Sequence, residues 1–151
     1  MSRLWVFQSN KPFTESETEH ISTTIKHYLT QWNAHGASLE GNFTIKYNQF
    51  IIIILDETHV QAPGCSIDDM TRTLKKLEQE LNLSLLGKTN IAYKESERIK
   101  MLPLKEFKKA VSEGIITPET LIFNNSVSTL EEFNTQWEIP IKRSWAKTLV
   151  K

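Results

Sequence analysis

The chain has 151 residues, 39% hydrophobic and 24% charged, with one cysteine, so it fits one or two globular domains without an internal disulfide. Its 18 basic and 18 acidic residues cancel, so no net charge attracts nucleic acid or an anionic membrane. The N-terminus lacks a signal-peptide core, and the longest apolar run, residues 50–55, is too short to span a bilayer. We therefore expect a soluble cytoplasmic protein that binds neither nucleic acid nor a membrane.

The first elements predict a strand followed by a helix. Residues 3–8 (RLWVFQ) are typical of a short strand. Thr14 and Glu17 then have the spacing of a capping box, which predicts a helix that begins there and ends near Gly36. Apolar residues recur along this helix at steps of three and four and predict one core-facing stripe: Ile21, Ile25, Tyr28, Leu29 and Trp32.

Two strands and a second helix follow. Residues 41–48 alternate apolar and polar side chains, as in a strand with one solvent-facing side, whereas residues 51–54 (IIII) predict a central strand covered on both faces. Ser66 is the predicted N-cap of the next helix, with Asp69 in the capping-box position. The buried stripe of that helix is predicted to contain Met70, Leu74, Leu77 and Leu81.

A hairpin completes the first predicted domain. Residues 90–104 (NIAYKESERIKMLPL) predict two strands with a turn near residues 95–97. The order strand, helix, strand, strand, helix, strand is typical of a ferredoxin-like α+β sandwich, which we assign to residues 1–96. Because helices cover only one face of such a sheet, the other face needs the rest of the chain or a second subunit in a homodimer.

The remaining segment, residues 97–151, predicts a short helix, a strand and a second short helix or turn, followed by EIPIKRSW, and is expected to pack against the first domain. The helix after residue 103 would have Leu104, Phe107 and Val111 on one side and end at Gly114. Four aromatic residues predict a small core for this segment: Phe123, Phe133, Trp137 and Trp145.

The sequence LPLKEFKKAVSEGIITPETLIFNN, residues 102–125, resembles the pattern of bacterial GYF-like domains. The residues that match this pattern are Leu102 or Leu104, Gly114, Ile116, Thr117, Pro118, Thr120, Leu121, Ile122, Trp137 and Pro140. The resemblance covers the last third of the chain and implies a small interaction or adaptor module.

The whole chain also resembles an uncharacterised bacterial family whose members carry RLWVFQSN, QWNAHG, GCSID, FNN and WEIP and are sometimes labelled ABC transporter ATPases. A phosphate-binding P-loop needs G-x-x-x-x-G-K-[ST] between a strand and a helix. Gly87, Lys88 and Thr89 supply the end of that motif, but Asn82 replaces its first glycine and the segment leads into a strand. We therefore predict no nucleotide hydrolysis.

Two loops, WNAHG at residues 32–36 and HVQAPGC at residues 59–65, are the predicted site. In a ferredoxin-like arrangement the first helix and the third strand end on the same side, so these loops become neighbours. A thiol at a helix start favours its thiolate, a nearby histidine could act as base, and a carboxylate could orient that histidine. This alternative is a cysteine-dependent enzyme with the candidate catalytic residues Cys65, His59, His35 and Asp56.

Two further interpretations use the same residues. Thiolate, imidazole and carboxylate together can bind zinc, but the spacing of His59 and Cys65 matches no standard zinc motif, so we predict no resident metal or cofactor. The simplest interpretation makes Cys65 a small packing residue and the histidines surface residues.

The preferred prediction is a binding or adaptor module rather than an enzyme. Its protein partner or small ligand would contact residues 32–36 and 59–69, with Trp32 as the floor of a small pocket. The predicted binding residues are Trp32, Asn33, Ser66 and Asp68.

Overall fold

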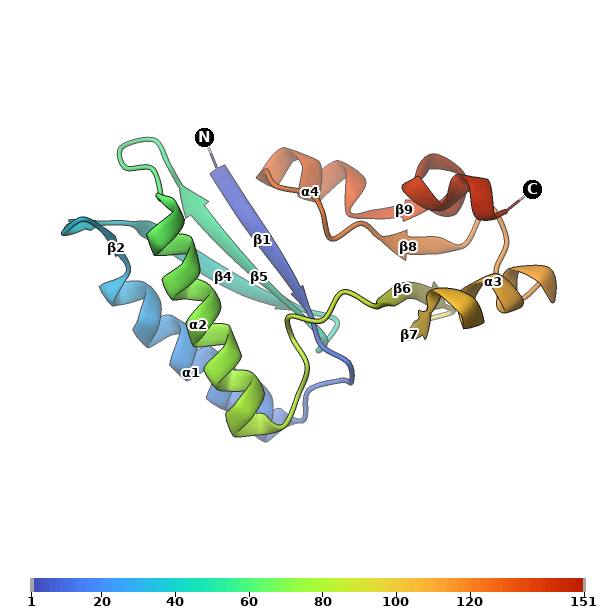
Figure 1. Ribbon diagram of the computed structural model, residues 1–151, viewed down its shortest axis with the longest axis horizontal. Helices are drawn as coiled ribbons and strands as arrows, with labels where there is room; N and C mark the ends of the chain where they lie inside the picture. The colour runs from blue at the N-terminus through green and yellow to red at the C-terminus, as the bar shows by residue number, and fades with distance from the viewer. Residues whose placement is uncertain (1, 151) are drawn as a thin grey trace. The chain divides into compact units, whose positions relative to one another are not determined.

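The computed structural model describes residues 2–150 and, as the sequence predicts, is of mixed α+β class, with four α-helices and antiparallel sheets in that range (Figure 1). None of these helices is both long and apolar enough to cross a bilayer. In chain order the elements are β1 (Ser2–Gln8), α1 (Glu15–Gln31), β2 (Asn33–Ala34), β3 (Ala37–Ser38), β4 (Glu40–Lys46), β5 (Phe50–Asp56), α2 (Gly64–Leu81), β6 (Asn90–Glu95), β7 (Arg98–Pro103), α3 (Leu104–Ser112), β8 (Leu121–Phe123), α4 (Leu130–Gln136), β9 (Glu138–Pro140) and the 3₁₀ turns η1 (Ile141–Arg143) and η2 (Trp145–Leu149).

The chain forms two compact units. Unit 1 contains residues 2–86 and 128–130, and unit 2 contains residues 87–127 and 131–150. The division therefore falls before the β6–β7 hairpin, not at residue 96 as the sequence predicts, because both hairpin strands share a sheet with β8 and β9.

The main sheet of unit 1 has the order β1-β5-β4, with β5 antiparallel to both neighbours. β1 and β4 are thus parallel to each other with β5 between them, which is a split βαβ arrangement. Residues 50–53 on β5 have no exposed surface, so the prediction of a central strand buried on both faces is confirmed.

Helix α1 forms as its sequence predicts. The Thr14 hydroxyl accepts a hydrogen bond from the Glu17 backbone at 3.1 Å, and the Glu17 carboxylate accepts one from the Thr14 N–H at 2.9 Å. α1 and α2 lie side by side on one face of the sheet (Figure 1). Their apolar stripes share one core with β5, which includes Ile21, Ile25, Leu29, Trp32, Ile51, Ile53, Met70, Leu74 and Leu77.

The start of α2 corrects one prediction. The helix begins at Gly64 with Pro63 in the N-cap position, and no side chain caps it. Ser66, the predicted N-cap, lies inside the helix because its hydroxyl donates instead to the Asn33 carbonyl oxygen at 2.7 Å. Asp69, the predicted capping partner, accepts a hydrogen bond from the Tyr28 hydroxyl at 2.8 Å.

The hairpin of residues 90–103 forms as predicted, but it does not supply a fourth strand to the sheet of unit 1. β6 pairs with β7 and with β8, in the order β7-β6-β8-β9. The outer edge of β1 instead meets a short segment from later in the chain, where Leu4 N–H donates to the Ser128 carbonyl at 3.0 Å and Arg3 forms an antiparallel bridge with Thr129. Ser128 and Thr129 therefore lie at the strand position beside β1.

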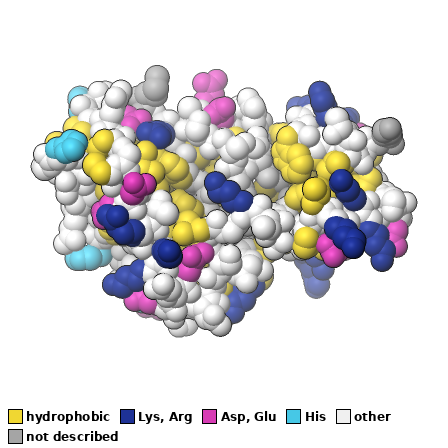
Figure 2. Space-filling view, viewed as in Figure 1, with side chains coloured by type: hydrophobic (Ala, Val, Ile, Leu, Met, Phe, Trp, Pro, Cys, Tyr) yellow, Lys and Arg dark blue, Asp and Glu magenta, His cyan; other side chains and the backbone are white. Residues whose placement is uncertain are grey.

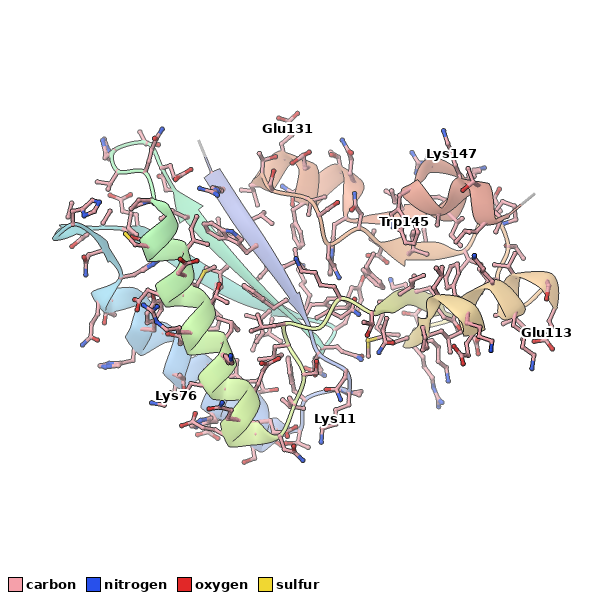
Figure 3. The ribbon with its side chains drawn as sticks, in the orientation of Figure 1. Lys11, Lys76, Glu113, Glu131, Trp145 and Lys147 are labelled. Carbon is pink, nitrogen blue, oxygen red and sulfur yellow. The ribbon has the colours of Figure 1, made fainter. Side chains whose placement is uncertain are left out.

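Unit 2 has its own core, formed by residues of the sheet, α3 and the two 3₁₀ turns, including Tyr93, Phe107, Ala110, Ile116, Ile122, Ile141, Ala146 and Val150. Trp137 packs against Phe123 and Phe133, with ring centroids 4.9 and 4.6 Å away, as predicted for the aromatic cluster. One predicted core residue is wrong, because Trp145 is 57% exposed. Trp145 lies on η2, as does Lys147 (Figure 3).

Candidate functional site

The two predicted loops lie next to each other in unit 1. The indole N–H of Trp32 donates to the Ser66 carbonyl oxygen at 2.9 Å, and the Ser66 hydroxyl donates to the Asn33 carbonyl oxygen at 2.7 Å. Residues 32–33 follow α1 and residue 66 lies in the first turns of α2, so the two bonds join segments 33 and 34 residues apart in the sequence. The predicted proximity of the loops is confirmed.

The first loop is a tight hairpin built from β2 and β3. His35 and Gly36 at its tip both have positive φ angles, 52° and 89°, as a two-residue type I′ turn requires. Asn33 stabilises the turn, because its side-chain oxygen accepts a hydrogen bond from the Gly36 N–H at 3.2 Å. His35 therefore sits at the exposed tip of a short structured hairpin.

Trp32 and Ser66 act inside the protein. Trp32 is 2% exposed and packs edge-to-face on Trp5, with ring centroids 6.0 Å apart, while Ser66 is 4% exposed. Both were predicted to contact a ligand, but a side chain with so little exposed surface cannot offer a pocket floor. Their role in the structure is to hold the two loops together.

The remaining predicted residues of the two loops are exposed. We call them the loop rim: Asn33, His35, His59, Cys65 and Asp68. Figure 2 shows histidine side chains on the surface of unit 1. The rim thus combines an amide, two imidazoles, a thiol and a carboxylate on two loops that a buried linkage joins.

The enzyme alternative requires Asp56 to orient a histidine, but Asp56 bonds Thr58 instead. Its carboxylate accepts hydrogen bonds from the Thr58 hydroxyl at 2.5 Å and from the Thr58 N–H at 2.9 Å. These bonds hold the pKa of Asp56 below its ordinary value, with smaller lowering effects from nearby charges that include His59. The carboxylate is therefore engaged in a local turn at the end of β5.

Cys65 is exposed, and the structure of residues 2–150 gives it no hydrogen bond to His35 or His59. The nucleophile–base contact that defines a thiol enzyme is therefore not formed. Within the same residues no group of three or more His, Cys, Asp and Glu side chains is placed to hold a metal ion. The zinc alternative consequently has no ligand set here.

A polar link between α1 and α2 was not predicted from the sequence. The Tyr28 hydroxyl donates to one Asp69 oxygen at 2.8 Å, and Arg72 donates to the other at 3.1 Å. Burial, and then the bond to Asp69, raises the pKa of Tyr28 far above its ordinary value. The signal available in the sequence is the position of Tyr28 on an apolar stripe, because a partly buried phenol needs a hydrogen-bond partner.

Unit 1 also carries a pocket that the sequence did not predict. It has a volume of about 450 Å³ and is lined by Phe13, Glu15, Thr18, Glu19 and Asn48. It lies at the start of α1, whereas the loop rim lies beyond the end of that helix. It contains none of the predicted site residues.

In comparisons with known proteins, the sequence matches no family model and no curated protein, and the structure matches no solved structure.

Proposed function

We propose that the chain is a binding or adaptor protein whose protein partner or small ligand contacts the loop rim. The observation that carries the proposal is the pair of hydrogen bonds that Ser66 makes with Trp32 and Asn33. They fix two loops from distant parts of the sequence in one arrangement before any partner arrives. Such preorganisation lowers the entropy that binding would otherwise have to offset.

The chemistry of the rim suits a polar partner. Asn33 and Asp68 present exposed hydrogen-bonding groups, and His35 projects from a structured hairpin tip. Because Asp56 is bonded to Thr58, and Cys65 has no hydrogen bond to His35 or His59 in the described part of the chain, binding is better supported than covalent catalysis.

We also propose a ferredoxin-like arrangement for unit 1, a GYF-like arrangement for the C-terminal segment, and a cytoplasmic location. The split βαβ order, with a bridge at Thr129 where a fourth strand would lie, supports the first assignment. In the C-terminal segment, Ile116 and Trp137 are buried, and both are among the residues that match the GYF-like pattern. Their burial supports the GYF-like assignment. A GYF-like module would favour an adaptor role.

Photo-crosslinking tests the binding proposal. A photoreactive phenylalanine analogue replaces His59 in one variant and Lys76, exposed on α2, in a matched control (Figure 3). In lysate of the natural host we expect an adduct of one defined mass from position 59 only. Adding Ser66→Ala should reduce its yield, because the loops are no longer tied together. Equal adducts from both positions, or none from position 59, would contradict the proposal.

Thiol alkylation tests the enzyme alternative separately. If His35 or His59 activated Cys65, replacing that histidine with alanine would slow alkylation of the native protein severalfold. Since neither imidazole bonds the thiol, we expect His35→Ala and His59→Ala to react within about twofold of the wild type. The rate is measured by mass spectrometry with a small iodoacetamide-type reagent, and a severalfold loss in either variant would favour the enzyme.

A further inference from the structure

The two edges of the unit 1 sheet differ. The outer edge of β1 is bonded to Ser128 and bridged to Thr129. On β4, the strand farthest from β1 in the sheet, no strand of residues 2–150 pairs with the outer side (Figure 1). β4 is seven residues long and pairs with β5 without interruption, from Glu40 opposite Asp56 to Lys46 opposite Phe50.

The hydrogen bonds show which backbone groups of β4 face outward. Phe43 N–H donates to the Asn42 side chain at 2.8 Å, so it is not used in the ladder with β5. At the end of the strand the Lys46 carbonyl accepts from the Gln49 N–H, on the β5 side. Because alternate residues of an antiparallel strand bond to opposite sides, the backbone groups of Gly41, Phe43 and Ile45 point away from the sheet.

This edge has few of the features that normally prevent pairing. Edge strands are usually protected by lysine and other charged side chains, by proline, by a bulge or by being very short. β4 (EGNFTIK) contains no proline, its register has no bulge, and its two charges stand only at its ends. Neither Glu40 nor Lys46 forms an ion pair within the described residues, and both are exposed.

We propose that β4 pairs with β4 of a second copy of this chain, in an antiparallel register centred on Phe43, to form a continuous six-stranded sheet. The sequence of β4 is self-complementary in this register. Glu40 of each copy lies opposite Lys46 of the other, so that two ion pairs of opposite charge form at the ends. Gly41 lies opposite Ile45, Asn42 opposite Thr44, and the two Phe43 residues face each other.

The local structure fits this register. Phe43 and Ile45 are partly buried on the helix-covered side, so an Ile45–Gly41 pair and a Phe43–Phe43 pair would extend the existing core. A Cβ at Gly41 would lie 3.0 Å from the side chains of Leu29 and Trp32, so these two side chains already fill the space over Gly41 on the helix-covered side. The Asn42 side chain, which bonds Phe43 N–H in one copy, would be displaced by the partner backbone.

A charge exchange tests both the dimer and its register, and it does not depend on the loop rim. We expect sedimentation equilibrium of the full chain to show dimers that dissociate on dilution. Glu40→Lys or Lys46→Glu alone places like charges at both ends and should raise the dimer dissociation constant about tenfold or more. An equimolar mixture of these two variants restores opposite charges in a heterodimer and should dimerise about as well as the wild type. Lys76→Glu, with a comparable change in charge on α2, should leave dimerisation unchanged.

A second test changes the backbone hydrogen bonding of the same edge. Asn42→Thr releases Phe43 N–H and introduces a residue that favours strands, so it should tighten the dimer severalfold. Thermal unfolding of each variant, measured by circular dichroism, checks that unit 1 remains folded. A wild type that stays monomeric at every concentration would overturn the proposal. The alternative would then be that β4 pairs with a strand of another protein. A dimer that the charge variants do not weaken, or that their mixture does not restore, would overturn the β4 register.

Discussion

Trp32 and Trp145 show how differently a tryptophan behaves in the two units. Trp32 lies among polar neighbours at a loop junction and is 2% exposed, whereas Trp145 was expected in an aromatic core and is 57% exposed. The polar neighbours of Trp32 suggested a ligand contact, and the other aromatic residues of its segment suggested a buried Trp145. The periodicity of the element to which each residue belongs accounts for the difference.

Trp32 continues the stripe of α1, three residues after Leu29, and its indole N–H bonds the Ser66 carbonyl from within the core. Trp145 begins η2, a 3₁₀ turn in which residues three apart share a side. Ala146 and Leu149 of that turn contact the core of unit 2, so Trp145 is directed away from it. A buried tryptophan with a satisfied N–H should matter for stability, and an exposed one should matter little.

The largest expected effect is that of Trp32→Ala. It removes a buried ring that packs on Trp5 and also unties the loops, and we expect it to lower the free energy of unfolding by about 3–5 kcal/mol. Urea denaturation followed by far-ultraviolet circular dichroism measures this change. A loss below about 1 kcal/mol would show that the ring does not carry the contacts that its burial implies.

Trp32→Phe separates the ring from the hydrogen bond. It keeps an aromatic side chain in the core but removes the indole donor from the Ser66 carbonyl oxygen, which lies within α2, and should cost about 0.5–1.5 kcal/mol. If Trp32→Phe were as harmful as Trp32→Ala, the indole bond would account for the whole effect.

Local patterns in the sequence were sufficient where the structure depends on neighbouring residues. The capping box of Thr14 and Glu17, the central strand β5 and the hairpin turn after Glu95 all formed as predicted. Ser66 was misread because its hydroxyl bonds Asn33, which is 33 residues away, and not the start of its own helix. The sheet to which β6 belongs was also misassigned, since its pairing with β8 connects residues far apart in the chain.

The candidate site shows the same limit. That two loops would meet followed from the expected topology, and the bonds of Ser66 confirm it. The partners of Asp56 and Asp69 did not follow, because Thr58 and Tyr28 satisfy these carboxylates by contacts that no spacing rule specifies. Sequence therefore located the loops but not the hydrogen bonds that decide what their side chains can do.

Tyr28→Phe should have an intermediate effect that depends on pH. The mutation removes the bond to Asp69 and should lower the free energy of unfolding by about 1 kcal/mol at neutral pH. Because the folded pKa of Tyr28 lies above the unfolded value of 10.0, the wild type keeps this contribution below pH 10 and loses it as the pH rises further. Denaturant unfolding between about pH 8 and pH 11 should show a shallower alkaline loss in Tyr28→Phe. Parallel curves would contradict this assignment.

The smallest expected effect is that of Trp145→Ala. Because more than half of the side chain is exposed, truncating it should change the free energy of unfolding by no more than about 0.5 kcal/mol. Iodide quenching of tryptophan fluorescence provides an independent readout, in which Trp145→Phe removes more of the quenchable emission than Trp32→Phe does. An exposed tryptophan that contributes little to folding is also free to contact a partner, since aromatic residues are enriched at binding surfaces. A loss of stability close to that of Trp32→Ala would instead mean that Trp145 packs in the core of unit 2, and the contrast between the two residues would disappear.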